Sequence, residues 1–306
     1  MSASDTSSTA ARAHDLSPAA WLGRAFAILL LIVFALFFVV PLVWLLIAPT
    51  KTDRQLLLEA PFAFGSIDTL VANWSSLVTF QGGLIWTWIG NSAFYCLAAL
   101  AISLVVSIPA GYALALTEFR GRRALLVATL IVMLVPSTAL ALPIFLELSA
   151  VRLIGNPLAA ILPFSFFPFG VYLTYIYFST AISRDLLDAA RIDGASEVQV
   201  FMRIAMPLAT PVIALVGFFN FTGNWNNYFL PYVMLSDQNA YNLPVGLGAL
   251  MAGSPALHPE RGGSFLPITR PEVALAGLIV VVPIACLFVI FQRYLVRGIL
   301  SGSVKS

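Results

Sequence analysis

Residues 25–48 read AFAILLLIVFALFFVVPLVWLLIA, an uncharged run that is long enough to cross a lipid bilayer as a helix. A helix rises about 1.5 Å per residue and the hydrocarbon core is roughly 30 Å thick, so one span needs about 20 mostly apolar residues. The same bias extends along the chain, in which 60% of the residues are hydrophobic and only 10% are charged. With a mean hydropathy of +0.93, the sequence predicts an integral membrane protein.

Five further stretches have the length and hydrophobicity of a span. Because lipid cannot satisfy free backbone polar groups, we expect each to be a helix, and the predicted fold class is an all-α polytopic membrane protein with six transmembrane helices. The first span is expected to be retained, because its apolar core is too long for a cleaved signal peptide and acidic residues precede it. The predicted spans are 25–48, 86–114, 125–148, 157–180, 207–235 and 272–295.

The remaining segments divide into tails, loops and a core. Residues 1–24 are rich in Ser and Ala and are predicted to be a mobile cytoplasmic tail, and residues 299–306 a second cytoplasmic tail. We expect residues 49–85 to form an external loop. Residues 86–298 are then a five-span core, which contains a polar cytoplasmic segment at 183–206.

The positions of Lys and Arg predict the orientation, because basic residues are retained on the cytoplasmic side. Six spans place both termini on the same face, and that face is the more basic one. Its basic residues are Arg12, Arg24, Arg120, Arg122, Arg123, Arg184, Arg191, Arg203, Arg293, Arg297 and Lys305. The opposite face has only Lys51, Arg54, Arg152, Arg261 and Arg270. Both termini and the segment 183–206 are therefore predicted to be cytoplasmic, and the net charge of +2 does not argue for nucleic acid.

The inventory of reactive side chains argues against bond-breaking catalysis. The two lysines, Lys51 and Lys305, do not follow a glycine, so the chain has no P-loop for ATP. The two histidines, His14 and His258, lie in the tail and in an external loop, which leaves no histidine pair for zinc and no evident Ser/His dyad. Both cysteines fall inside predicted spans and indicate neither a disulfide framework nor a metal site.

The polar segment 183–206 is predicted to form two short helices. Ser183 is a candidate N-cap, Gly194 is expected to close the first helix in a left-handed conformation, and Ser196 begins a capping-box pattern. Two adjacent alanines on the first helix would let another protein approach the backbone closely. A solvated surface helix that merely links two spans explains the same pattern. The candidate docking residues are Asp188, Ala189, Ala190, Arg191, Asp193 and Gly194.

Residues 188–207 resemble the cytoplasmic EAA loop of ATP-binding-cassette (ABC) importer permeases. The pattern of that loop is Glu-Ala-Ala, three residues, Gly, nine residues and Ile-x-Leu-Pro. Asp188 replaces the glutamate on a shorter stem, and Met206 replaces the leucine by a near-isosteric apolar side chain. The residues that match at full spacing are Ala189, Ala190, Gly194, Ile204 and Pro207.

Further motifs extend the resemblance over most of the chain, to carbohydrate-uptake permeases of the maltose-permease type and to the smaller, "G"-like subunit of such pairs. Their joint order is specific, although each alone is weak. The segment 251–270 departs from the family because it is longer than the usual external loop. The motifs are Asn91-Ser92, Gly111-Tyr112-Ala113-Leu114, Arg191-Ile192-Asp193-Gly194-Ala195, Trp225-Asn226-Asn227, Leu243-Pro244-Val245-Gly246-Leu247 and Phe291-Gln292-Arg293-Tyr294-Leu295-Val296-Arg297-Gly298.

The resemblance implies a type I importer in a bacterial inner membrane. A member of that family pairs with a second permease, two cytoplasmic ATPase subunits and an external solute-binding protein, and carries a carbohydrate through the lipid bilayer. By this resemblance, ATP and Mg would be held by the ATPases and no cofactor by this chain. The helix at 184–193 would sit in a groove of the ATPase, and the C-terminal tail would either reach the ATPases or be a simple disordered end.

A stripe of amides in the fifth predicted span is a candidate substrate path. Amides at membrane depth are costly when they face lipid, so the stripe should face the bundle interior, and an aromatic ring among amides suits a polyhydroxylated solute. Tight helix contacts explain the same residues equally well as interhelical glue. The residues concerned are Asn220, Asn224, Trp225, Asn227 and Tyr228.

Two polar residues of the third predicted span are further path candidates. Glu147 is the only carboxylate well inside a predicted apolar run, and the alternative is that it is solvated or paired with Arg152 near the interface. Ser137 lies mid-span beside Pro136, where it could line a path or bond to a freed carbonyl.

Other functional classes remain alternatives. An ion-coupled secondary transporter or a small channel usually has internal repeats, broken helices or buried ionisable groups, and the sequence has no convincing repeat and almost no buried charge. An ABC permease for a non-sugar solute and a structural membrane scaffold are two further alternatives. The sequence does not reveal which carbohydrate is carried.

Overall fold

The computed structural model describes residues 18–254 and 268–301, and every regular element within these ranges is helical. The all-α class is therefore confirmed for the described chain. The elements are α1 (Pro18–Ile47), η1 (Ala48–Thr50), α2 (Asp53–Leu58), α3 (Ile67–Thr79), η2 (Phe80–Gly82), α4 (Leu84–Leu116), α5 (Arg122–Leu134), α6 (Ala141–Ala150), α7 (Pro157–Ser165), α8 (Pro168–Ala181), α9 (Arg184–Ile192), α10 (Glu197–Val200), η3 (Phe201–Ala205), α11 (Met206–Leu208), α12 (Thr210–Trp225), α13 (Phe229–Met234), η4 (Gln238–Ala240), α14 (Leu243–Gly253) and α15 (Arg270–Ser301).

The long helix α4 is the centre of the bundle, and α7, α8, α12 and α14 pack against it. Glycine allows α4 and α8 to approach each other closely. A Cβ atom built on Gly111 of α4 would lie 2.5 Å from the Cβ atom of Thr174 on α8, so any side chain there would push the two helices apart. Small residues at such crossings are typical of helices that associate in membranes.

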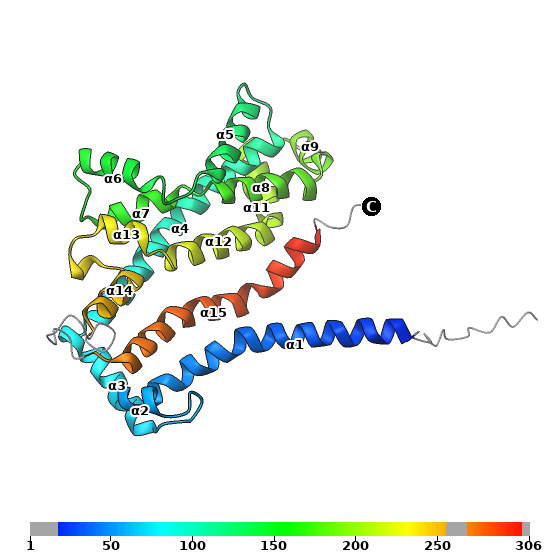
Figure 1. Cartoon of the computed structure of the whole chain (residues 1–306). Coiled ribbons are helices and arrows are strands. Elements are labelled where there is room, and N and C mark those ends of the chain that lie inside the picture. The colour runs from blue at the N-terminus through cyan, green and yellow to red at the C-terminus, as the bar shows by residue number, and fades with distance from the viewer. Residues whose placement is uncertain (1–17, 255–267, 302–306) are drawn as a thin grey trace, which may run out of the picture.

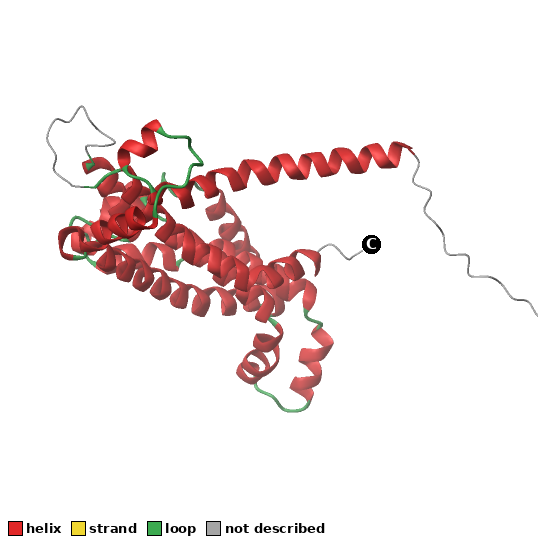
Figure 2. Ribbon diagram, turned by 90° about the horizontal axis from the view of Figure 1, so that it is seen from below, coloured by secondary structure: helices red, strands yellow, loops and turns green. Residues whose placement is uncertain are grey.

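The N-terminal part of helix α1 stands apart from the bundle, as Figures 1 and 2 both show, and its C-terminal part contacts α15. None of its most apolar 18-residue window is buried inside the chain. The chain that follows α1 is held firmly at the opposite end of the bundle from α9. There Asn73 of α3 donates from Nδ2 to the carbonyl oxygens of Pro49 and Lys51, at 2.8 and 3.0 Å.

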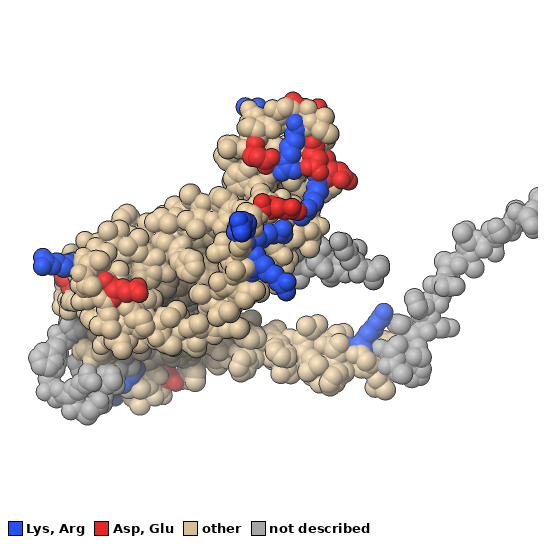
Figure 3. All heavy atoms as spheres, turned by 90° about the horizontal axis from the view of Figure 1, so that it is seen from above, with Lys and Arg blue, Asp and Glu red and all other residues tan. Residues whose placement is uncertain are grey.

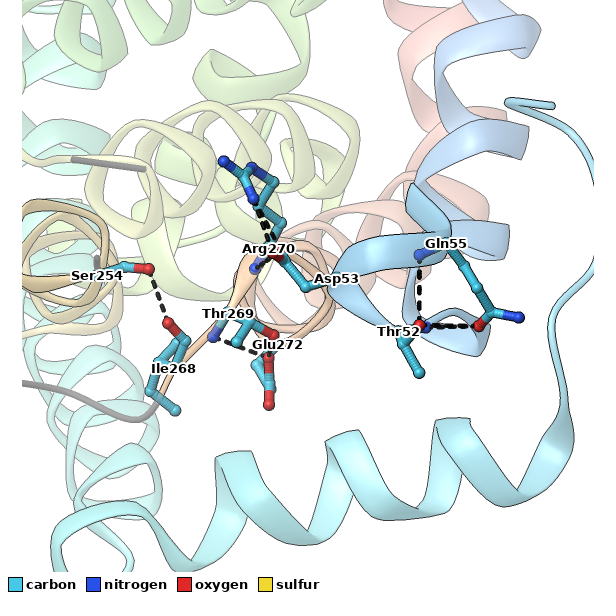
Figure 4. Close-up of polar contacts among 8 residues, drawn as sticks. All are labelled: Thr52, Asp53, Gln55, Ser254, Ile268, Thr269, Arg270 and Glu272. Atoms are coloured by element: carbon cyan, nitrogen blue, oxygen red, sulfur yellow. Dashed lines mark hydrogen bonds and ion pairs between the residues drawn. The ribbon is translucent and has the colours of Figure 1, made fainter. Parts of the chain in front are cut away.

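A second contact ties the same region to the start of α15 (Figure 4). The Nη1 atom of Arg270 lies 2.8 Å from Oδ2 and 3.0 Å from Oδ1 of Asp53, and the Arg270 backbone N–H also donates to Oδ1. We call η1, Asp53, Asn73 and Arg270 the external clasp, after the side of the membrane on which the sequence predicts this end to lie. Beside it, the Ser254 hydroxyl donates to the Ile268 carbonyl at 2.7 Å. This bond joins the two described segments that flank residues 255–267. Most of the long loop predicted at 251–270 therefore falls in residues 255–267, which lie outside the described residues.

The predicted count of six spans is not confirmed, and three of the predicted spans are broken. Four described helices are long and apolar enough to cross a membrane, and five when the bent pair 197–208 and 210–225 is counted as one span. The third predicted span, 125–148, is instead split into α5 and α6. Val135 adopts an extended conformation before Pro136, which is the conformation that a following proline favours.

The fifth predicted span, 207–235, is broken as well. The chain bends by 74° between the helical stretches 197–208 and 210–225, and α12 ends at Trp225 before the separate helix α13. The fourth predicted span also carries a break, between α7 and α8, where Pro168 begins the second helix. These proline-associated breaks leave backbone polar groups that other residues of the bundle must satisfy.

The two ends of the molecule differ in charge. Figure 1 shows α9 and the end of α15 at one end, and α2, α3 and α14 at the other. Figure 3 shows charged side chains gathered towards the end where α9 lies, while the flank of the bundle carries almost none. This distribution agrees with a bilayer around the uncharged flank, since basic residues concentrate on the cytoplasmic side.

Candidate functional site

The capping residues of the segment 183–206 determine where its two short helices begin and end. The Ser183 hydroxyl accepts a hydrogen bond from the Asp185 backbone N–H at 3.2 Å, which caps the start of α9. Gly194 follows the C-cap Asp193 and closes the helix with a left-handed φ of +85°, and the Ala195 N–H donates to the Ala190 carbonyl at 3.0 Å. Ser196 caps α10 through a capping box. The predicted positions of both caps and of the closing glycine are therefore confirmed.

Arg191 links the two short helices. Its Nη1 atom donates to Oδ1 of Asp188 at 2.6 Å, and its Nε and Nη2 atoms donate to the two carboxylate oxygens of Glu197 at 2.7 and 3.1 Å. The bonds from Arg191 lower the pKa of Glu197 below its ordinary value. Because the two carboxylates are mostly exposed, solvent screens their attraction, and the contact chiefly fixes the angle between α9 and α10.

Leu187 seats the segment on the bundle. Its side chain is almost fully buried in a cluster with Tyr112 of α4, Phe178 of α8 and Val200 of α10. The Tyr112 ring lies edge-on to Phe178, with 5.4 Å between ring centroids, and 4.9 Å from the ring of Phe201. Sequence reasoning missed Leu187, although its position three residues before Ala190 was an available signal.

The outer surface of the segment is partly apolar. Asp188, Ala189 and Asp193 are exposed there, whereas Ala190 is half-buried against the bundle. Large apolar side chains accompany them, of which Ile192 is 85% exposed. Such a surface suits contact with another protein better than contact with water. The other exposed apolar residues are Leu186, Val198 and Met202.

The predicted asparagine stripe forms a buried cluster beside the helix breaks. Asn220 and Asn224 are only 3% and 8% exposed, and Asn224 donates from Nδ2 to Oδ1 of Asn220 at 2.9 Å. Asn220 donates in turn to the carbonyl of Phe164, near the break between α7 and α8, at 3.3 Å. The Asn227 carbonyl, beside the break between α12 and α13, accepts from Asn242 at 2.7 Å. The cluster thus satisfies backbone groups in the way that the glue interpretation requires.

A small cavity adjoins this cluster. It measures about 10 Å³, which is room for one water molecule and not for a sugar. The Nδ2 atom of Asn227 is buried without a hydrogen-bond partner, and Asn227 lines the cavity. In this conformation the asparagine cluster is closed to a carbohydrate.

The two aromatic residues of the predicted stripe, Trp225 and Tyr228, contact other aromatic rings and not the asparagine cluster. Trp225 is buried, stacks on Phe221 with ring centroids 5.6 Å apart, and donates from Nε1 to the Val280 carbonyl of α15 at 2.9 Å. Tyr228 is partly exposed and stacks on Tyr232, with 5.4 Å between ring centroids. The structure therefore separates these rings from the amides instead of forming one stripe.

The candidates from the third predicted span lie on the surface. Ser137 is exposed in the break between α5 and α6, and Glu147 is exposed on α6. The expected ion pair between Glu147 and Arg152 is absent, although both residues are described. Arg152 instead occupies a left-handed turn with φ of +58° after α6. Glu147 is thus solvent-exposed and does not pair with Arg152, and its role as a path residue stays a prediction.

A polar ladder between α4 and the chain before α14 was not anticipated. It consists of side chains on successive turns of α4 that bond to backbone groups about 150 residues away. The motif Asn91-Ser92 was a signal, but nothing local identified its partners. The bonds are Trp88 to Gln238, Asn91 to Asn239 and Tyr241, Ser92 to Leu243 and Tyr95 to Ala240.

Residues 107–301 match the family described as the binding-protein-dependent transport system inner membrane component. The chain belongs to this family. The predicted resemblance to ABC importer permeases is thereby confirmed, and membership favours ATP-driven import over the ion-coupled alternative.

Individual relatives extend the match to nearly the whole chain. The arabinooligosaccharides transport system permease protein AraQ of Halalkalibacterium halodurans is 32% identical over 268 residues, which cover 87% of this chain and 91% of the relative. The trehalose transport system permease protein SugB of Mycobacterium tuberculosis is 31% identical and covers 74% of this chain and 79% of the relative. A chain from the crystal structure of a bacterial ABC transporter that imports alginate superposes with a TM-score of 0.76, at 23% identity, over 91% of this chain and 98% of that one. That likeness supports the fold.

Proposed function

We propose that this chain is a permease subunit of an ATP-driven carbohydrate importer and forms half of its translocation path. The observation that carries the proposal is the segment 183–206, whose glycine-terminated helix α9 is seated on the bundle by Leu187 and leaves an apolar outer face. The sugar-transport names of the relatives support the substrate class. A multi-pass protein of a bacterial inner membrane fits the same family.

In this proposal the outer face of α9 docks on a cytoplasmic ATPase subunit. The bonds of Arg191 and the burial of Leu187 make the segment move as one unit. A displacement of α9 would therefore pass to α4 and α8, which contribute Tyr112 and Phe178 to the same cluster. Closure of two ATPase subunits around ATP and Mg would supply that displacement, and this chain would act as a non-catalytic transducer.

A second permease subunit would complete the path. Helix α1 buries none of its apolar window within this chain, and helices α4, α12 and α15 border an open apolar cleft. Both surfaces support a further membrane subunit. An external solute-binding protein would deliver the carbohydrate to the opposite end of the bundle from α9.

A matched pair of glycine variants tests the coupling role. Gly194 and Gly121 both have left-handed φ angles, +85° and +92°, and a Cβ atom on either would meet nothing within 4 Å. Valine at either site imposes a similar strain of about 1–2 kcal/mol. We expect Gly194→Val to lower sugar uptake by cells about tenfold or more, because that strain falls on the docking helix, while Gly121→Val retains most uptake.

Uptake is measured with labelled oligosaccharides in cells that contain the assembled transporter, and membrane insertion is checked by immunoblot. Equal uptake by the two variants would contradict the coupling role. Labelled amino acids and peptides serve as substrate controls. Import of those solutes without any carbohydrate would contradict the substrate class and leave the coupling mechanism intact.

A further inference from the structure

Helix α3 has three distinct faces, and only one of them packs against the protein. Leu77 is fully buried beside Ile85 and Trp88, and Asn73, one turn earlier on the same side, bonds to the chain after α1. These contacts fix the rotation of α3 about its own axis. The remaining two faces are therefore presented in constant directions.

The two outer faces differ in chemistry. Ile67, Val71 and Trp74 recur at intervals of four and three residues and form one stripe, with exposed fractions of 61%, 59% and 40%. Asp68 and Ser75 belong to the neighbouring stripe, which is also exposed but polar. A helix whose exposed surface divides lengthwise into apolar and polar stripes is typical of the membrane–water boundary.

The position of α3 places the apolar stripe at that boundary. In Figure 1, α3 runs across the ends of α1 and α15 instead of alongside them. It packs against η1, where α1 has just ended, and against α15. The Trp74 ring lies edge-on to the ring of Trp86, near the start of α4, with 6.2 Å between centroids. The stripe is thus level with the points where three spans end.

Neighbouring residues continue the same apolar surface. The end of α2 and the turn that follows it expose further large side chains, which no described part of the chain covers. Tryptophan and other aromatic rings concentrate at the level of lipid headgroups because one part of the ring is apolar and the other can hydrogen-bond. The exposed residues are Leu57, Leu58, Phe62 and Phe64.

We infer that α3 is a membrane-surface helix whose Ile67–Val71–Trp74 stripe lies among the phospholipid headgroups and upper acyl chains of the external leaflet. The same end of the molecule holds the C-terminal end of α1, whose apolar window is unburied and requires lipid or another membrane helix. A water-soluble partner would approach from the side of the polar stripe and would not reach Val71. The segment 49–85 is then an anchor that sets the depth of the external clasp in the bilayer, and not simply an external loop.

The test compares two positions on adjacent stripes of the same helix. In the full chain with Cys96→Ala and Cys286→Ala, a spin label is attached to Val71→Cys or, as the matched control, to Ser75→Cys. The protein is reconstituted in phosphatidylcholine–phosphatidylglycerol vesicles and also studied in membranes that contain the assembled transporter. We expect the Val71 label to collide with oxygen, which partitions into lipid, more than with a water-soluble nickel chelate, and the Ser75 label to show the opposite preference.

Two results would overturn the inference. A Val71 label that meets the nickel chelate freely would place the stripe in water, and one that meets neither reagent would place it against protein. If the labelled chains do not fold, quenching of tryptophan fluorescence by brominated lipids decides the question in the unlabelled protein. Trp74→Phe should then remove a strongly quenched component, and its failure to do so counts against the anchor. Neither experiment depends on sugar transport or on ATPase docking.

Discussion

The external clasp and the segment 183–206 each rely on an arginine–carboxylate contact, but the two contacts join different things. Arg270 pairs with Asp53, which lies 217 residues away in the chain. Arg191 pairs with Asp188 and Glu197, which lie three and six residues away. The first contact therefore holds distant helices together, whereas the second shapes one short segment.

This difference assigns different mechanical roles to the two ends. At the end opposite α9, η1, α3 and α15 converge, and the clasp holds α1 and α15 close. Towards the other end, α1 separates from the rest of the molecule in Figure 1. Among the described residues, no charged side chain of the segment 183–206 bonds to a residue so distant in sequence, and the buried side chain of Leu187 holds the segment on the bundle. We expect the clasp to act as a fixed point while the segment moves with α4 and α8.

The largest expected effect comes from removing that seat. Leu187→Ala should destabilise the protein by about 2–5 kcal/mol, because it deletes a buried side chain and leaves a cavity among Tyr112, Phe178 and Val200. Leu186→Ala, on the exposed side of the same helix, is the matched control and should change the free energy of unfolding little. Thermal unfolding of the purified chain in detergent measures both. Equal losses in the two variants would mean that Leu187 does not anchor the segment.

A smaller effect is expected at the clasp. Asp53→Asn should cost about 1 kcal/mol, because the contact is charge-assisted but about one third of each side chain remains exposed to screening solvent. A double-mutant cycle with Arg270→Gln isolates the pairwise energy from other effects of each substitution. Disulfide cross-linking between cysteines introduced into η1 and α15 then reports whether the helix ends separate. Strict additivity of the two substitutions would show that the pair does not couple α2 to α15.

The sequence predicted those parts of this comparison that depend on local chemistry. Ser183, Gly194 and Ser196 define the ends of α9 and α10 through bonds that span only a few residues. Long apolar runs likewise predicted α1, α4 and α15, because hydrophobic length alone decides whether a helix can cross a bilayer. Composition and capping are properties of one segment, so one segment is enough to reveal them.

Features that depend on distant partners could not be predicted in the same way. The breaks beside Pro136 and Pro168 lie within apolar runs that are long enough to span a membrane. Each break frees backbone polar groups from helical hydrogen bonds, and a membrane protein tolerates this only where other groups of the bundle satisfy them. The inward direction of Asn220 and Asn224 was predicted, but the turn of Trp225 towards Val280 depends on where α15 lies. The pairing of Asp53 with Arg270 had no local signal at all.

The smallest expected effect is a pH-dependent change in thermal stability at the Arg191–Glu197 contact, which lies more exposed to solvent than the Arg270–Asp53 contact. Because Arg191 holds the pKa of Glu197 below its ordinary value, the ionised carboxylate contributes stability above the unfolded pKa of about 4.5 and loses it as the pH falls through the lower folded value. Glu197→Gln should therefore reduce thermal stability slightly at pH 7 and make no difference in strong acid, and Glu118→Gln, at another exposed glutamate, serves as control. Unfolding temperatures of the three proteins across this pH range measure the effect. If Glu197→Gln instead lowers stability equally at every pH, the glutamate acts through packing or capping of α10, and the charge of Arg191 does not set the angle between the two helices.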